Sequence, residues 1–197
     1  MFHKLINIIF LVFLSSGYAQ ADYESASAAY EAGDYETVIE LLIPLAKAGD
    51  AKAQYNLGIM YQQGLGVEQD HTEALKWTRK AAAQGFAGAQ YNLGVMYRDG
   101  LGVEQDHTEA VNWYHKAAAQ GNAPAQYNLG IMYHYGYGLQ KDNVQAYAWA
   151  GIAAANGYAD AIQNRDFLET RLTLNELEEA RQLAREYWEK YVNKTNH

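Results

Sequence analysis

The sequence predicts an all-α protein, an α/α solenoid of stacked antiparallel helical hairpins with a helical cap at its C-terminal end. The hexapeptide Ala-Gln-Tyr-Asn-Leu-Gly occurs at 53–58, 89–94 and 125–130, at a spacing of 36 residues. A longer stretch, which opens with Gly-Leu-Gly and ends with Asp-His-Thr-Glu-Ala, fills 64–74 and returns unchanged at 100–110. Self-similarity at a fixed period of this size indicates stacked units, each of which packs on its neighbours.

The first helix of each unit is predicted at 51–63, 87–99 and 123–135, because apolar residues recur there at helical spacing. The glycine that ends the hexapeptide lies in the middle of each of these helices, where it costs roughly 1 kcal/mol relative to alanine. Since that cost recurs three times, we expect the second helix of the unit to approach so closely that no Cβ fits.

The second helix of each unit has an explicit start and end. An aspartate precedes a glutamate or glutamine by three residues, which is the spacing of a capping box, and a glycine follows the last turn. The aspartates are Asp70, Asp106 and Asp142, and the glycines are Gly85, Gly121 and Gly157. The paired glycines of the connecting loops predict turns. One tryptophan in each second helix is expected to fill the space between consecutive units; these are Trp77, Trp113 and Trp149.

A further helical hairpin is predicted before the repeats, at 22–49. Its helices are expected at 22–32 and 35–48. Pro44 has no N–H to donate to Glu40, so we expect it to kink or restart the second helix.

Residues 159–192 depart from the period and are predicted to form capping helices. Thr173 and Glu176 have the spacing of a capping box, which opens a helix that runs to about Val192. A terminal helix with a polar outer face stops a solenoid from adding further copies of itself. Residues 193–197 are predicted to be a disordered tail.

Residues 1–21 have the pattern of a secretory signal peptide. Lys4 supplies a positive n-region, 5–14 is an apolar h-region, and an A-x-A cleavage site follows at 19–21. The apolar run is shorter than the roughly 20 residues that cross a bilayer. We therefore expect a mature chain that starts at Asp22, lacks a membrane span, and is exported to the periplasm or secreted.

The composition limits the partners. The chain has 15 basic and 23 acidic residues, a formal net charge of −8, and loss of Lys4 with the signal peptide makes it −9. An acidic surface repels phosphate backbones and anionic headgroups, so nucleic acid and anionic membranes are not expected partners. The chain has no cysteine, so it forms no disulfide bond even in an oxidising compartment.

The repeated unit resembles the Sel1-like repeat. The pattern A-x-A-Q-Y-N-L-G-x-M-Y-x-x-G-x-G-V-x-Q-D-x-x-x-A-x-x-W-x-x-K-A-A-x-Q-G covers consecutive copies within 50–158, at 51–86, 87–122 and, with changes, 123–158. The hairpin before them resembles the related tetratricopeptide repeat. The resemblance implies a right-handed superhelix whose first helices line a concave surface. It also implies protein–protein scaffolding as the usual role.

Motifs of catalysis and cofactor binding are weak in this chain. The Gly-x-Gly loops lack the preceding strand and the lysine that phosphate binding needs. His71 and His107 occupy equivalent positions, roughly 10 Å apart by helix packing, too far to share one zinc ion, and both are expected to be solvated. No cysteine nucleophile and no G-x-S-x-G motif is present. The sequence therefore predicts no enzyme, no cofactor and no metal.

One face of the first helices is the best candidate for a binding surface. At about 100° per residue, positions 52, 55, 56, 59, 62 and 63 point away from the second helix. Tyrosine and asparagine are constant on this face, whereas the last two positions change completely between units. The candidate residues are Tyr55, Asn56, Gln62, Gln63, Tyr91, Asn92, Arg98, Asp99, Tyr127, Asn128, His134 and Tyr135.

Two interpretations of the constant residues stay open. Asparagine can hydrogen-bond both ways to a peptide backbone, and tyrosine gives contact area at low entropy cost. The same residues could instead bridge neighbouring first helices. Among the variable positions, Arg98 and Tyr135 are the expected anchors, because arginine and aromatic residues dominate interface hot spots.

The sequence predicts an exported, non-enzymatic adaptor that binds a protein or peptide along this face. The alternative is a cell-envelope factor that recognises cell-wall glycopeptide or a small ligand, with weak hydrolase activity. A glycan binder is expected to combine aromatic platforms with paired carboxylates in one cleft, and the repeated face shows tyrosine without such pairs.

Overall fold

The computed structural model describes residues 17–193, and this part of the chain contains ten α-helices and no strand. In chain order they are α1 Gly17–Glu31, α2 Tyr35–Lys47, α3 Ala51–Gln63, α4 His71–Ala83, α5 Ala87–Asp99, α6 His107–Ala118, α7 Ala123–Tyr135, α8 Asn143–Ala155, α9 Asp160–Glu169 and α10 Leu174–Tyr191. The predicted all-α class is confirmed. Residues 1–16 of the predicted signal peptide lie outside the described part of the chain, and residues 17–21 form the start of α1. Residues 194–197 of the predicted tail also lie outside it.

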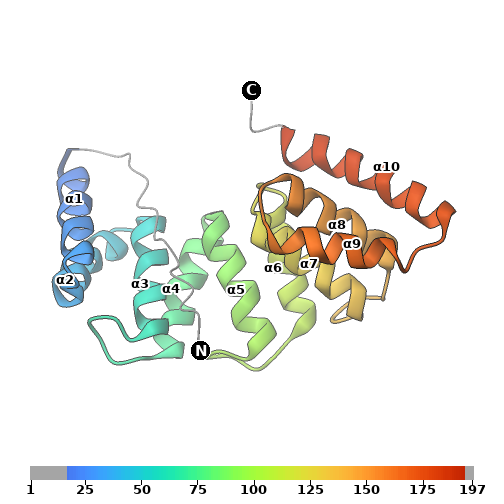
Figure 1. Ribbon diagram of the computed structural model, residues 1–197. Helices are drawn as coiled ribbons and strands as arrows, with labels where there is room; N and C mark the ends of the chain where they lie inside the picture. Colours follow the sequence, from blue (N-terminus) through green and yellow to red (C-terminus); the bar gives the residue numbers. More distant parts are fainter. Residues whose placement is uncertain (1–16, 194–197) are drawn as a thin grey trace.

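The helices form a row of antiparallel hairpins. Figure 1 shows them following one another from α1–α2 at one end to α7–α8, with α10 lying across the last hairpin. The second helix of each hairpin packs against the first helix of the next, as in α2 with α3, α4 with α5 and α6 with α7. This is the stacking of a solenoid.

The predicted helix limits agree with the structure in the repeats. Helices α3, α5 and α7 have the predicted bounds, and the side chains of Asp70, Asp106 and Asp142 accept backbone N–H groups at the starts of α4, α6 and α8. Of the two outcomes predicted at Pro44, a kink or a restart, the restart does not occur, because α2 continues through the proline to Lys47. Leu42 and Ala46, on either side of the proline, are each only 1% exposed, so the helix is held by its packing despite the missing hydrogen bond.

The mid-helix glycines lie against the second helix of their own hairpin, as predicted. A Cβ on Gly94 would lie 2.6 Å from the ring of the fully buried Tyr114. On Gly58 it would lie 2.6 Å from Oγ1 of Thr78, and on Gly130 it would lie 3.1 Å from a backbone oxygen of α8. At Gly58 and Gly94 a neighbour would have to move to admit a Cβ, and at Gly130 it would have to give by a few tenths of an ångström.

The connecting loops hold one unit on the next. Gly102 has a φ of 70°, and a Cβ at this position would lie 2.2 Å from the carbonyl oxygen of His71, the first residue of α4. Only glycine combines this left-handed conformation with so close an approach. The equivalent contacts join Gly66 to Tyr35 and Gly138 to His107.

A repeated set of side-chain amides, of which the first-helix glutamines are buried, also joins consecutive units. The side-chain amide of Gln90 in α5 donates to the carbonyl of Ala82 near the end of α4, at 3.3 Å. Its oxygen accepts from Gln120 at 2.7 Å, and Gln120 also donates to the carbonyl of Gly85. Carbonyls that the end of a helix leaves without partners are satisfied in this way. The set recurs as Gln54 with Gln84 and as Gln126 with Asn156.

The tryptophans lie between units, as predicted, and the last one anchors the cap. Trp77 packs in one cluster with Leu42 of the preceding hairpin. Trp149 is 1% exposed and lies 4.6 Å and 5.5 Å, between ring centroids, from Tyr187 and Tyr191 of α10. The predicted cap helix is therefore present and covers the second helix of the last repeat.

Candidate functional site

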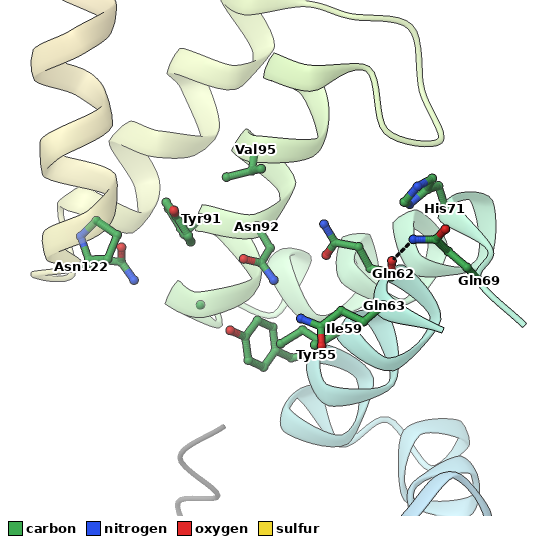
Figure 2. Close-up of a pocket in the computed structure, with 12 residues that line it drawn as sticks. Tyr55, Ile59, Gln62, Gln63, Gln69, His71, Tyr91, Asn92, Val95 and Asn122 are labelled. Carbon is green, nitrogen blue, oxygen red and sulfur yellow. Dashed lines mark hydrogen bonds between the residues drawn. The ribbon is translucent and has the colours of Figure 1, made fainter. Parts of the chain in front are cut away.

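A groove of about 680 Å³ lies between the first helices α3 and α5 and reaches the start of α7. It is lined by Tyr55, Ile59, Gln62, Gln63, Gln69, His71, Gly88, Tyr91, Asn92, Val95, Asn122 and Pro124. Five of the twelve predicted site residues meet here, namely Tyr55, Gln62, Gln63, Tyr91 and Asn92. Figure 2 shows the side-chain amides of Gln62, Gln63 and Asn92 around one space, with the two tyrosines beside it.

The groove is rich in amides and has no charged side chain among its described lining residues. Gln69 is held by a 2.7 Å hydrogen bond to the backbone oxygen of Gln62. The side chains of Gln62, Gln63 and Asn92 make no hydrogen bond within the described part of the chain. Each of these amides offers a donor and an acceptor to a ligand.

The next pair of first helices explains why this groove stays open. Arg98 in α5 is the repeat equivalent of Gln62, and Asn128 in α7 is the equivalent of Asn92. Arg98 donates to Oδ1 of Asn128 at 2.9 Å, so a side-chain bridge spans the space between α5 and α7. The shorter glutamine makes no such bridge to Asn92, which leaves the space between α3 and α5 accessible.

The two tyrosines are fixed by neighbouring rings. Tyr55 lies 5.0 Å from Phe86, and Tyr91 lies 6.0 Å from Tyr114, between ring centroids. Burial raises the pKa of the Tyr55 and Tyr91 hydroxyls above the ordinary value of 10.0, so both remain protonated and able to donate at neutral pH. Both tyrosines therefore have a packing role, Tyr55 at the junction with the next unit and Tyr91 within its own unit, and both also line the groove.

Several predicted site residues do not line the groove. Asn56 and Asn128 are only 3% and 6% exposed, although they were expected to point outward. Asn128 bridges neighbouring helices through Arg98, and it also donates to the carbonyl of Pro124. Arg98 is held further by two 2.7 Å bonds to Asp99.

The predicted residues of the third unit gather elsewhere. Tyr135 is 60% exposed and stacks on Tyr137 at 5.4 Å, and His134 packs edge-on against Phe167 of α9. Tyr127 packs against the ring of Tyr158. These side chains are therefore brought together around the α7–α9 end, away from the groove lining.

The two equivalent histidines are less solvated than expected. His71 and His107 are half-buried, and their Nδ1 atoms are buried without a hydrogen-bond partner in the described residues. The loop glycines of the following unit pack on the backbone of both residues, which removes them from open water. His71 lines the groove, whereas His107 stacks on Tyr137.

Of the groove residues that were not predicted, Ile59, Gly88, Val95 and Pro124 lie on the counted helical face, whereas the other three come from outside it. Gln69 and His71 belong to the loop and the start of α4, and Asn122 lies at the start of α7. A helical-angle count within one helix cannot find them. The relevant signal is the stacking of units, which brings the start of the third unit beside the first.

Within residues 17–193, no helix is long and apolar enough to cross a membrane. The same part of the chain contains no group of three or more histidine, aspartate or glutamate side chains placed to hold a metal ion.

The hairpin stack and its groove define a class, namely an α-helical repeat protein with an uncharged groove between its first helices. The Sel1 repeat family model matches residues 51–86, 87–122 and 123–158, more than half of the chain. The chain belongs to the Sel1 repeat family, whose repeats commonly act as protein–protein interaction scaffolds.

Two solved structures share the fold. One is c5321, a protective antigen present in uropathogenic Escherichia coli strains, with 39% identity over 90% of this chain and a TM-score of 0.83. The other is a Sel1 repeat protein from Oxalobacter formigenes, with 37% identity over 72% of this chain and a TM-score of 0.68. The present chain covers 39% and 58% of those chains, respectively.

A viral protein shares a shorter stretch. The sel1-like repeat-containing protein L18 of Acanthamoeba polyphaga mimivirus is 49% identical over 39 residues, which is 20% of this chain and 7% of that protein.

Proposed function

We propose that this protein is an exported adaptor that binds an extended segment of a partner protein in the groove between α3, α5 and α7. The observation that carries the proposal is the unbridged set of amides at Gln62, Gln63 and Asn92, beside two protonated tyrosines. An uncharged surface of donors and acceptors suits a peptide backbone, whose N–H and C=O groups alternate along the chain.

The chemistry of the groove favours a peptide over the alternative ligand, a cell-wall glycopeptide. Sugar hydrolysis by the common mechanism needs two carboxylates that flank the scissile bond. The described groove lining contains none. The ordinary scaffold role of Sel1 repeats also supports a protein partner and a non-enzymatic function.

Export is part of the proposal and rests on the N-terminal pattern. Tyr23, two residues after the expected cleavage site, is 5% exposed, and its hydroxyl donates to Asp50, the N-cap of α3. A mature chain that starts at Asp22 therefore keeps this contact. The similarity to a protective antigen supports an exported location. Sequencing the N-terminus of protein recovered outside the cytoplasm should give Asp22, and an uncleaved cytosolic chain would contradict export.

The binding claim is tested with peptides selected from a displayed random library on the mature protein. Replacing Gln63 and Asn92 together by alanine should weaken the best peptide by roughly 2 kcal/mol, about 30-fold in Kd, because hot-spot contacts have this size. The matched control is Gln163→Ala, which removes an exposed amide from α9. Circular dichroism should be unchanged in both. Equal affinity of the double variant and the control would refute the groove as the binding site.

A further inference from the structure

A second cavity lies at the other end of the solenoid, where α10 crosses α8. Its volume is about 330 Å³, within the range of small-molecule sites. Its apolar surface comes mainly from Gly151, Ile152 and Ala155 of α8 and from Ala184 and Trp188 of α10. Its polar lining includes Arg165, Arg181, Arg185 and Glu189.

The third repeat departs from the first two at this place. Position 151 is Gly where the earlier units have Arg79 and His115, and position 152 is Ile where they have Lys80 and Lys116. An apolar residue is expected here, since α10 covers this side of α8. A glycine is not explained by that cover.

Gly151 differs from the mid-helix glycines that close packing requires. A Cβ on Gly151 would meet only the Cβ of Ala184 at 3.6 Å, an ordinary contact, whereas a Cβ on Gly94 would lie 2.6 Å from a buried ring. Alanine would fit and would favour the helix. With Ala155 and Ala184 beside it, the glycine leaves an open pocket at the surface where α8 and α10 pack together.

Arginines and carboxylates line the mouth of this space together. Three of the six arginines of the chain line it, against one acidic side chain, Glu189. Two of the three are already paired, because Arg165 bonds Asp166 at 2.7 Å and Arg181 bonds Glu169 at 2.7 Å. Arg185 makes no hydrogen bond or ion pair within the described residues. Its guanidinium is therefore the one in this lining that is free to bond a monoanionic group.

We propose that the cavity between α8, α9 and α10 binds a carboxylate carried on an aromatic or aliphatic group. The carboxylate pairs with Arg185, and the apolar group enters the space beside Gly151 and packs on Trp188. Two sources offer this chemistry, a free organic acid and the C-terminal residue of a peptide. The inference is independent of the peptide groove, because none of these residues lines it.

The test uses 3-phenylpropionate as the probe, titrated into the mature protein by calorimetry and by nuclear magnetic resonance. We expect saturable binding with a Kd of about 1 mM or tighter and amide shifts at Gly151 and Arg185. The uncharged 3-phenylpropionamide should bind at least about tenfold more weakly, since a bond to a charged group is worth that much. Equal affinity of acid and amide, or no binding of the acid, would overturn the proposal.

Three variants locate the site. Arg185→Gln should weaken the acid at least about tenfold, and Gly151→Leu should abolish binding by filling the space. Arg171→Gln is the matched control, because Arg171 is exposed and lies over the ring of Phe167 outside the cavity. Circular dichroism identifies any variant that fails to fold. Unchanged affinity in folded Arg185→Gln would overturn the assignment.

The peptide Gly-Gly-Phe, with a free or an amidated C-terminus, distinguishes the two sources. Tighter binding of the free-carboxylate peptide than of 3-phenylpropionate identifies a peptide C-terminus as the ligand. Binding of the small acid without binding of either peptide identifies a free organic acid. If the amidated peptide binds as well as the free one, the carboxylate is not recognised and the proposal is wrong.

Discussion

Replacing Gly94 by alanine should destabilise the protein, although alanine is the better helix former. The helical preference alone would stabilise by up to about 1 kcal/mol. The added Cβ would however lie 2.6 Å from two carbons of the Tyr114 ring, which is fully buried. Overpacking of this kind costs about 1–3 kcal/mol, so the expected net loss is about 1 kcal/mol.

The matched control is Gly151→Ala, in which the Cβ meets only Ala184 at 3.6 Å. This variant should gain stability from the helical preference. Thermal unfolding followed by circular dichroism should show Tm shifts of opposite sign, each about 2–4 °C per kcal/mol for a chain of this size. In a Tyr114→Ala background the cost of Gly94→Ala should disappear. A stabilising effect at both glycines, or an unchanged cost in that background, would refute the close-packing explanation.

Three further changes test other parts of the structure. The double variant Gln62→Arg with Gln63→Asp gives the first repeat the residues of the second. The new arginine should bond Asn92 and close the groove, so peptide binding should be lost while the Tm is unchanged. Retained peptide binding would contradict this explanation. Gln90→Leu should lower the free energy of unfolding by about 1–3 kcal/mol, since it leaves the buried carbonyl of Ala82 without its partner. Denaturant titration measures this loss against Gln163→Leu, which removes an exposed amide. Burial lowers the pKa of His115 below 6.5, so the unfolded chain takes up the proton first and stability falls as the pH drops below that value. The fall in Tm between about pH 7.5 and pH 5.5 should therefore be smaller in His115→Phe, and an equal fall would exclude His115 as its source.

The repeated elements were predictable because each rule acts within a short stretch of chain. Helices α3, α5 and α7 follow from periodicity, and the starts of α4, α6 and α8 follow from their aspartate caps. The close approach at the mid-helix glycines could also be inferred, because an unfavourable residue recurred in equivalent positions. The continuation of α2 through Pro44 could not be inferred from the sequence, since it depends on burial of neighbouring residues in the core.

The candidate site was predictable only in part. A helical-angle count found Tyr55, Gln62 and Asn92 but could not show that Asn128 is occupied by Arg98. That bridge depends on the side-chain reach between units, which one sequence does not encode locally. The amide set around Gln90 was missed for the same reason, although its period of 36 residues was visible.

Photo-crosslinking tests the central claim most directly, that a peptide lies in the groove between α3 and α5. A photoreactive amino acid is placed at Gln63 in the groove or, as a control, at the exposed Gln163 of α9, and each protein is irradiated with a selected peptide. We expect a peptide adduct from position 63 that excess unlabelled peptide suppresses, and none from position 163. Equal labelling at both positions, or labelling only at 163, would contradict the groove as the binding site.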